Sequence, residues 1–538
     1  MHHLPLELNR TAMAVTGGLV LDRVINRIEA LPERPSAPET AADRVASFLA
    51  PPPARGGDLK PLLDRLDEAA DCAVETAGPG LLAYIPGGGL YTAALADLYT
   101  RAANRYGGLA AMAPGFAALE ESVLRWMATE VCGLPDGSGG LLTSGGSMAT
   151  FTAVVAARHD RLGEDIGTGT VYTTAFAHHS VAKAARLAGI KEAHIRLVPY
   201  TDDLRMDPVA AAGMIEADRA AGLRPFLLVA TAGTTDTGTI DPLPPLAALA
   251  QQENLWLHVD AAYGGFFRLT ERGRQRLAGM ELADSITLDP HKSLFMPFGT
   301  GALVVRDRAA LQAAHAGSGN YLQDTTPVPG VPDPAHLGPE LTHEVRGLRV
   351  WLPLHLHGVD AFREALDEKL DLAAHVHSVL STLPGLEVPR TPDLTCVTFR
   401  IRPEDDSPAA AQRADLAGRT LLERINAHQR VLLSSTVVDD RFTLRLCVVS
   451  HRTHRDRINE ALDLIATELA NVAALTDSTS ATLHEHAAAL SDSTTAKLHE
   501  HETVPLPRPL LPSPQHHVEL APHPGTDHRS PARLAADR

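Results

Sequence analysis

Asn-Leu-Trp-Leu-His-Val-Asp-Ala-Ala-Tyr-Gly-Gly, residues 254–265, is the stretch from which the fold of this 538-residue chain can be inferred. Its short apolar run, bounded by turn residues, predicts a buried strand. Asp260 stands at the carboxyl end of that strand, where open α/β sheets bind their ligands. The segment therefore predicts a sheet of buried strands and a carboxylate beside a bound ligand.

Four further runs resemble this strand. They read GTVYTT (169–174), PFLLVAT (225–231), DSITLD (284–289) and GALVVRD (301–307). Between them lie longer Ala-, Leu- and Arg-rich segments with the composition of helices. Strands that alternate with helices form parallel sheets through right-handed crossovers. The region from about 61 to 470 is therefore predicted to be an α/β fold.

The composition excludes several classes of protein. Hydrophobic residues make up 44% and charged residues 21% of the chain, and the net charge is −17. A negative field repels phosphate backbones, so nucleic-acid binding is not expected. Apolar runs stay below the ~18 residues of a membrane span, and the N-terminus is a poor secretion signal. The four cysteines form no C-x-x-C pair, so we expect reduced thiols in a cytoplasmic protein without a membrane or metal partner.

A glycine-rich turn provides the first chemical signal. Residues 143–150 read Thr-Ser-Gly-Gly-Ser-Met-Ala-Thr and precede an Ala-rich helical pattern. Gly146 lets the backbone approach a ligand closely, and the start of a helix presents free N–H groups to an anion. The hydroxyl of Ser147 would add a donor to this phosphate cup. Alternatively, the segment is an ordinary turn in which Ser147 caps the helix.

Lys292 provides the second signal, because it follows the strand-like run ending at Leu288 in the sequence Asp289-Pro290-His291-Lys292. Most lysines are solvated surface residues, but an amine in a ligand site can form a Schiff base. Pyridoxal phosphate unites the three features, since its phosphate needs the cup, its aldehyde a lysine and its pyridine nitrogen an acid. The sequence therefore predicts this cofactor.

From about residue 10 to 470 the chain resembles the group II pyridoxal-phosphate-dependent amino-acid decarboxylases, which include the aromatic-L-amino-acid and glutamate decarboxylases. The spacing between Asp260 and Lys292 is similar to that of the aromatic decarboxylases, without a gap. Residues 178–181, His-His-Ser-Val, are similar to the family's H-x-S-V segment. Residues 230–235, Ala-Thr-Ala-Gly-Thr-Thr, are similar to its A-T-x-G-T-T segment.

The resemblance implies a type I fold, with a large domain around a mostly parallel seven-stranded sheet, a small C-terminal α/β domain and an N-terminal arm. In that fold Lys292 would hold the cofactor, Asp260 would keep its pyridine nitrogen protonated, and His178 and Ala262 would cover the two ring faces. The implied cofactor-binding residues are Gly146, Ser147, His178, Thr235, Asp260, Ala262, His291 and Lys292. The family usually has Asn where this chain has Asp289, which adds a carboxylate near the phosphate.

The resemblance also assigns the proton-transfer step to a tyrosine. Tyr321 follows Lys292 in the register of a family tyrosine on a loop that reaches in from the partner subunit. Relatives with Phe at this position release aldehydes instead, so Tyr321 favours simple decarboxylation. Lys292, Tyr321, His178 and Asp260 are thus the expected catalytic residues. Alternatively, Tyr321 is an ordinary exposed loop residue.

The expected substrate contacts are Tyr84, Ile85, Tyr106 and Gly108. Family aromatic residues are replaced at Ile85 and Gly108, and the family Trp-His pair is replaced by Thr76 and Ala77. Lost stacking weakens the binding of an aromatic ring by about 0.5–1.5 kcal/mol per pair. We therefore expect an L-amino acid with an apolar, branched aliphatic side chain such as valine or leucine. Aromatic substrates are the alternative, because Tyr84 and Tyr106 remain and Gly108 would leave room for a ring.

Composition and resemblance together divide the chain into four parts. Residues 1–60 would be a dimerisation arm, 61–355 the large cofactor-binding domain, 356–474 the small domain and 475–538 a disordered tail. The tail contains a repeated segment with His-Glu-His triplets, and its few apolar residues cannot form a core. The family resemblance implies a homodimer with the active site at its interface.

Two other functions remain open. The chain could be a different pyridoxal-phosphate enzyme, such as an aminotransferase or an aldehyde synthase, because this fold supports several reactions. Keto-acid or aldehyde products would identify such an enzyme. It could also be an inactive cofactor-binding scaffold whose tail recruits a partner, which would bind the cofactor without turning over any amino acid.

Overall fold

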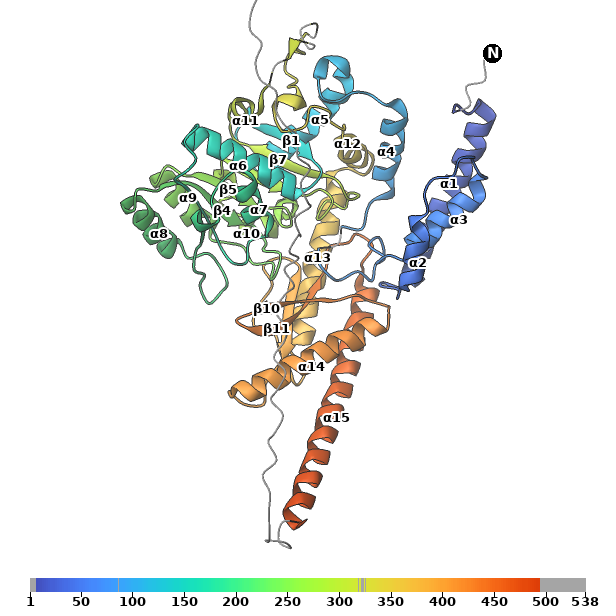
Figure 1. Ribbon diagram of the computed structural model, residues 1–538, viewed down its shortest axis with the longest axis vertical. Helices are drawn as coiled ribbons and strands as arrows, with labels where there is room; N and C mark the ends of the chain where they lie inside the picture. The colour runs from blue at the N-terminus through green and yellow to red at the C-terminus, as the bar shows by residue number, and fades with distance from the viewer. Residues whose placement is uncertain (1–5, 86, 318, 321–323, 325, 494–538) are drawn as a thin grey trace, which may run out of the picture. The chain divides into compact units, whose positions relative to one another are not determined.

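The computed structural model describes residues 6–85, 87–317, 319–320, 324 and 326–493. Its centre is a seven-stranded sheet (Figure 1). In spatial order the strands are β1 (Gly139–Thr143), β7 (Gly301–Val305), β6 (Ser285–Leu288), β5 (Trp256–Asp260), β4 (Arg224–Thr231), β2 (Gly169–Thr173) and β3 (Ile195–Leu197). Only β7 runs antiparallel to its neighbours in this sheet. The predicted mostly parallel sheet is confirmed.

Both faces of this sheet are buried. Along β4, Leu228 and Ala230 belong to one hydrophobic core, whereas Leu227 and Val229 belong to another. Successive side chains of a strand point to opposite faces, so a strand covered on both sides reads as a continuous apolar run. The helices of this domain are α4 (Tyr91–Ala103), α5 (Pro114–Trp126), α6 (Gly146–Leu162), α7 (Ser180–Leu187), α8 (Pro208–Ala220), α9 (Leu243–Gln252), α10 (Glu271–Arg276), α11 (Arg308–His315) and α12 (Leu348–His357).

A smaller antiparallel sheet follows. Its strands are β10 (Ser434–Val438), β11 (Arg441–Cys447), β9 (Cys396–Ile401) and β8 (Leu386–Glu387), in that spatial order, and its helices are α13 (Val359–Leu380), α14 (Pro408–Ala427) and α15 (Arg455–Ser493). The long helix α13 joins the two domains, because its first half packs in the large-domain core and its second half in the small-domain core. The sequence of residues 430–436, Arg-Val-Leu-Leu-Ser-Ser-Thr, predicts one continuous strand. The backbone of Leu432, however, hydrogen-bonds to the backbone of Gly80 and Leu82, so β10 begins only at Ser434.

The N-terminal helices are α1 (Arg10–Ala30), α2 (Ala42–Ala46) and α3 (Leu59–Ala70). Arg23 pairs with Asp64 and Asp67, which ties α1 to α3. No residue of α1 is buried in the single chain. Its exposed apolar side chains therefore leave a surface without cover from the described part of this chain. These side chains are Leu19, Val20, Leu21, Val24 and Ile25.

The chain divides into two compact units, residues 1–477 and 478–538. The described part of the second unit, residues 478–493, is helical and continues α15, so the boundary expected at residue 475 falls inside a helix. Most of the expected tail lies outside the described residues. Among the described helices, none is both long enough and apolar enough to cross a membrane.

Candidate active site

The carboxyl ends of five strands border one cavity of about 300 Å³. The glycine-rich turn follows β1, His178 follows β2, Thr235 follows β4, Asp260 ends β5 and Lys292 follows β6. The structure brings together all eight residues that the sequence assigned to the cofactor. They are Gly146, Ser147, His178, Thr235, Asp260, Ala262, His291 and Lys292.

The glycine-rich turn forms a cradle at the start of α6. The hydroxyl of Thr143 donates a hydrogen bond to the carbonyl of Gly145 (3.0 Å), which holds the turn against the end of β1. A Cβ added at Gly146 would lie 2.9 Å from Asp289 Oδ2, and one at Gly301 would lie 2.5 Å from Gly145 Cα. Glycine is required at both positions because backbone and carboxylate already occupy the space of a side chain.

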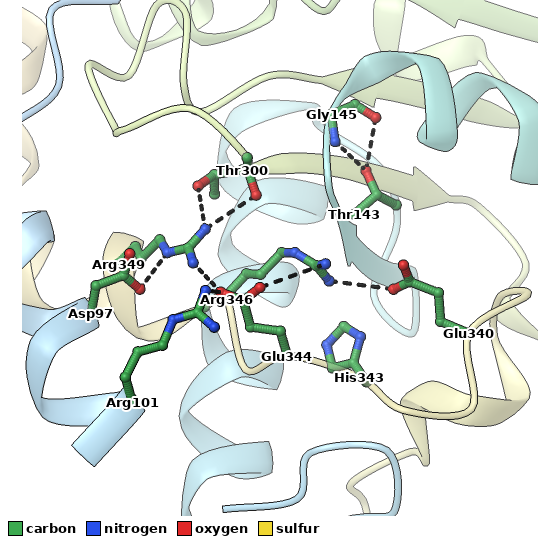
Figure 2. Close-up of polar contacts among 12 residues, drawn as sticks. Asp97, Arg101, Thr143, Gly145, Thr300, Glu340, His343, Glu344, Arg346 and Arg349 are labelled. Carbon is green, nitrogen blue, oxygen red and sulfur yellow. Dashed lines mark hydrogen bonds and ion pairs between the residues drawn. The ribbon is translucent and has the colours of Figure 1, made fainter. Parts of the chain in front are cut away.

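An ionic network around Arg349 reaches Thr300 (Figure 2). Arg349 of α12 pairs with Asp97 and Glu344 and donates to the hydroxyl of Thr300 (3.3 Å). The carbonyl of Thr300 in turn hydrogen-bonds the backbone N–H of His291 (3.2 Å) and its ring Nδ1 (2.8 Å). The network therefore positions the His291 segment relative to α4 and α12.

Asp260 is held where a rigid strand ends. Asp260 is only 6% exposed, and its carboxylate oxygen Oδ1 accepts a hydrogen bond from the backbone N–H of Ala262 (3.1 Å). His258, two positions earlier, is fully buried and hydrogen-bonds Ser285 and Thr287. Burial lowers the pKa of His258 to about 4, so this histidine is neutral and structural. Asp260, the last residue of β5, is therefore the carboxylate of this strand that lines the cavity.

Lys292 pairs with the carboxylate of Asp289. Its Nζ lies 2.9 Å from Asp289 Oδ2, and Asp289 is nearly fully buried. Burial by itself would lower the pKa of Lys292, but Asp289 and Asp260 outweigh it and raise that pKa. The second oxygen of Asp289, Oδ1, is buried without a hydrogen-bond partner among the described residues, and so is Thr231 Oγ1. Both residues line the cavity, so a ligand could satisfy them.

His178 lies on the loop before α7, where its ring Nδ1 accepts a hydrogen bond from the backbone N–H of Ser180 (3.2 Å). Nδ1 also lies 2.7 Å from Ser180 Oγ. Burial lowers the pKa of His178, while the charge of Asp260 opposes that shift. The ring is therefore neutral and fixed in orientation, as a side chain that stacks on a flat ligand needs to be.

These residues fit pyridoxal phosphate. The cavity offers a helix start with a glycine cradle for a phosphate, an amine for an aldehyde and a carboxylate for a ring nitrogen. Further lining residues that the motifs did not single out are Ser144, Gly145, Met148, Ser180, Thr231, Gly233 and Tyr263. All of them lie inside the segments 143–150, 178–181, 230–235 and 254–265 that carried the motifs, so assigning whole segments to the cofactor site, and not single positions, would have found them.

The expected substrate residues lie elsewhere. Among the described residues that line this cavity, none is Tyr84, Ile85, Tyr106 or Gly108. Tyr84 is 66% exposed, while Ile85 is half-buried against the large-domain core. The expected proton donor, Tyr321, lies outside the described residues.

The expectation of free space at Gly108 is wrong. A Cβ at Gly108 would lie 2.1 Å from the carbonyl oxygen of Leu341, which also accepts a hydrogen bond from Tyr106 OH (2.8 Å). The backbone carbonyl of Leu341 occupies the space that a side chain at residue 108 would fill, so no room is left there for the aromatic ring of a substrate. Gly87 is similarly constrained, because its Cβ would lie 1.9 Å from the carbonyl oxygen of His291.

A second cavity, of about 280 Å³, lies on the other side of His291. Thr76 and Ala77 both line it. Most other lining side chains are apolar, and they include Val24, Ile28, Leu90, Met296 and Phe298. Arg452 also lines it, but its guanidinium donates to the carbonyls of Ala77, Gly88 and Gly89.

Comparison with known proteins identifies the family. The profile described as "Pyridoxal-dependent decarboxylase conserved domain" matches residues 53–402. An aromatic-L-amino-acid decarboxylase from Bacillus atrophaeus is 32% identical over 451 residues, which cover 83% of this chain and 93% of that protein. An L-2,4-diaminobutyrate decarboxylase from Rhizobium meliloti is 34% identical over 352 residues, covering 65% of this chain and 70% of that protein.

Among solved structures, that of Oryza sativa TDC with PLP and tryptamine superposes with a TM-score of 0.80 at 27% identity, covering 86% of this chain and 99% of that one. The fold, the strand-end cavity and the sequence matches agree with one another. The chain therefore belongs to the pyridoxal-dependent decarboxylase family, and it is an amino-acid decarboxylase that uses pyridoxal phosphate.

Proposed function

We propose that this enzyme removes the α-carboxylate of an L-amino acid with an apolar, branched aliphatic side chain, such as valine or leucine, and releases the amine and CO₂. The observation that carries the catalytic part is the convergence of Lys292, Asp260 and the Gly146 cradle on one cavity. The aliphatic preference is supported by the second cavity, at the positions where the family has aromatic side chains.

Each cavity residue has a definite task in this proposal. The cofactor, when bound, supplies an electron sink for the electron pair that CO₂ leaves behind. The N–H groups at the start of α6 and the hydroxyl of Ser147 bind its phosphate. Lys292 would hold the cofactor by its aldehyde through the amine Nζ. Asp260 keeps a proton on the pyridine nitrogen, and His178 packs on the ring.

Tyr321 is proposed to protonate the α-carbon after CO₂ has left. A tyrosine hydroxyl can serve as a general acid when it is placed within hydrogen-bond reach. The family resemblance implies that this residue comes from the partner subunit. Decarboxylation without such a donor would leave the carbon open to oxidation, which is the route to aldehydes.

The lining of the second cavity supports an uncharged substrate side chain. Among its described lining residues there is no Asp or Glu that could pair with a cationic side chain, as diaminobutyrate would require. The one guanidinium in that described lining, that of Arg452, is already bonded to three backbone carbonyls. An aliphatic side chain loses no hydrogen bond there and gains about 25 cal/mol for each Å² of apolar surface removed from water.

An aromatic amino acid is the second candidate. Several relatives are named as aromatic, tyrosine or tryptophan decarboxylases, and they cover more than 70% of this chain. The absence of free space at Gly108 counts against a ring at that position. The two candidates therefore differ in what the second cavity, at Thr76 and Ala77, offers the substrate side chain.

The test is kcat/KM for valine, leucine, phenylalanine, tyrosine and 2,4-diaminobutyrate, measured by CO₂ release. We expect valine or leucine to exceed phenylalanine by at least tenfold. The variant Ala77→Phe, at a residue that lines the second cavity, should reduce that ratio by about 2- to 10-fold, because one aromatic pair contributes about 0.5–1.5 kcal/mol. A tenfold preference of the wild type for any aromatic substrate would overturn the aliphatic assignment. Amine and CO₂ as products would exclude an aminotransferase or aldehyde synthase.

A homodimer is part of the same proposal. The apolar side chains of α1 are exposed in the single chain, and the large ones between Leu19 and Ile25 favour burial against a second copy. Light scattering after size exclusion should give twice the mass of one chain. Replacing Leu21 and Ile25 by Glu should yield monomers, and a monomeric wild type that is fully active would contradict an active site shared between subunits.

A further inference from the structure

Two of the four cysteines, far apart in the sequence, lie side by side in the small domain. Cys396 begins β9 and Cys447 ends β11, and the antiparallel register places them directly opposite each other. Their sulfur atoms are 3.4 Å apart, and both residues are buried. Both are free thiols in this structure.

The backbone around this pair suits a disulfide. The N–H of Cys447 donates to the carbonyl of Leu82, and the N–H of Val448 donates to the carbonyl of Thr395. Cys396 and Cys447 therefore do not exchange backbone hydrogen bonds with each other. In antiparallel sheets such pairs have Cα atoms about 4.5 Å apart, which lies within the range of about 4.4–6.8 Å found in disulfides. The sulfur atoms can bond through side-chain rotation, with the strands in place.

The surroundings favour a reactive thiolate at Cys396. The thiol of Cys447 donates a hydrogen bond to Cys396 Sγ, and this contact, together with the charge of Arg445, lowers the pKa of Cys396 although burial acts against it. The same contact and burial raise the pKa of Cys447. The pair thus resembles a nucleophile with a thiol beside it that can resolve an oxidised intermediate.

A small oxidant has a route to the pair. Cys396 lines a third cavity, of about 310 Å³, together with the side chains of Arg205, Arg390, Thr237 and Thr239. Cys447 is not among the described residues that line that cavity, so Cys396 is the member of the pair that borders it. Hydrogen peroxide is close to water in size and fits such a space easily.

We propose that Cys396 and Cys447 are a peroxide-oxidisable pair that closes a reversible disulfide between β9 and β11. The Cys396 thiolate attacks one peroxide oxygen, the O–O bond breaks, and Cys396 becomes a sulfenic acid while hydroxide leaves. Cys447 then attacks the Cys396 sulfur, the S–O bond breaks, and a second hydroxide leaves. The protons of the two thiols convert both hydroxides to water, so that two thiols and one peroxide give one disulfide and two waters.

The pair also contacts the cofactor cavity through one residue. Arg445 lies 3.6 Å from Cys447 Sγ through one of its nitrogens. The same guanidinium donates to the carbonyls of Thr235 and Asp236, and Thr235 lines the cofactor cavity. The charge of Arg445 also acts on Cys396. Oxidation would remove the negative charge of the Cys396 thiolate and thus change the charge on the small-domain side of the active site.

The other two cysteines provide the contrast. Cys132 is fully buried in the large-domain core, and burial raises its pKa to about 12, so it should resist oxidation. Cys72 is partly exposed near the end of α3. Among the described residues neither has a second sulfur beside it, so neither is expected to form a disulfide within the chain.

The experiment treats the full-length, cofactor-loaded enzyme with hydrogen peroxide, alkylates the remaining thiols under denaturing conditions and maps the peptides by mass spectrometry. We expect one cross-link between the peptides of Cys396 and Cys447, with two alkylated thiols left and all four restored by dithiothreitol. The matched control is the double variant Cys72→Ser, Cys132→Ser, which should form the same cross-link. The variant Cys447→Ser should give Cys396 sulfenic acid and no cross-link.

Three outcomes would overturn the proposal. They are an unmodified pair in the wild type, overoxidation of Cys396 without a cross-link, and a cross-link between two chains or to Cys72. Because the decisive measurement is made on the wild type, a variant that fails to fold does not affect it.

Discussion

The residues predicted to hold the cofactor and those predicted to contact the substrate occupy different kinds of structure. Of the predicted cofactor residues, Asp260 and Lys292 stand at or just after the ends of central, fully buried strands. Of the predicted substrate residues, Tyr84 and Gly108 lie on irregular segments between helices, and neither lines the cofactor cavity. The ends of these strands are fixed by the backbone hydrogen bonds of the sheet and by the hydrophobic cores on its two faces. The position of an irregular segment depends instead on the residues that it packs against.

This difference decides what a motif can predict. A residue at a strand end keeps its position whatever the neighbouring loops do, so type and spacing suffice to assign it. A loop residue such as Gly108 cannot be interpreted from its type alone, because the space of its missing side chain belongs to Leu341. The predictions below test the two groups of residues in turn, from the largest effect to the smallest.

Lys292→Ala should have the largest effect. Without the amine the cofactor has no covalent attachment, and we expect turnover to fall by more than about 1,000-fold. The visible absorption band of lysine-bound cofactor should disappear as well. Lys183→Ala, which removes an exposed lysine from α7, is the matched control and should change neither quantity. An unchanged band in Lys292→Ala would locate the attachment at another lysine.

Asp260→Asn should come next. The amide retains the shape and can still accept from Ala262, but it no longer supplies the negative charge that keeps a proton on the ring nitrogen. Loss of one preorganised charge costs on the order of 100- to 1,000-fold in kcat. Cofactor content, measured after denaturation, should stay closer to the wild-type value than kcat does. A nearly wild-type kcat in this variant would show that the charge of Asp260 does not contribute to catalysis.

Gly108→Ala tests one of the predicted substrate residues. Because the added methyl would meet the carbonyl of Leu341, we expect a loss of about 1–3 kcal/mol in the free energy of unfolding. Gly115→Ala in α5, where the added carbon meets nothing within 4 Å, is the control and should be neutral or stabilising. Denaturant unfolding of both variants measures this. Equal stability of Gly108→Ala and the wild type would restore the view that position 108 is open.

Asp289→Asn should have the smallest effect, and in the opposite direction. Removing a carboxylate next to the Gly146 cradle removes its repulsion of the cofactor phosphate, so the Kd for pyridoxal phosphate should fall about tenfold, or about 1.4 kcal/mol. Equilibrium dialysis of the apo-enzyme measures this. The control is Asp284→Asn, just before β6 at the opposite end of that strand. Weaker binding by Asp289→Asn would mean that the carboxylate assists the phosphate site.

The sequence was sufficient for the sheet and for the gathering of the predicted cofactor residues around one cavity, since buried strands read as apolar runs and the motifs follow them directly. It was not sufficient for Cys396 and Cys447, which looked like scattered thiols. Their proximity depends on the register of β9 and β11, and no local pattern in either strand encodes that register. It also missed the late start of β10, because Leu432 pairs with Leu81, which lies in a distant part of the chain.

The close approach of Gly87 to the carbonyl of His291 has a consequence for altering the enzyme's substrate range. Any side chain at residue 87 would push on the peptide that carries Lys292 and would disturb the attachment point before it reshaped the pocket. A combinatorial library should therefore hold residue 87 constant and vary Thr76 and Ala77, which line the second cavity. Variants selected from such a library would differ in specificity while they inherit the same catalytic geometry.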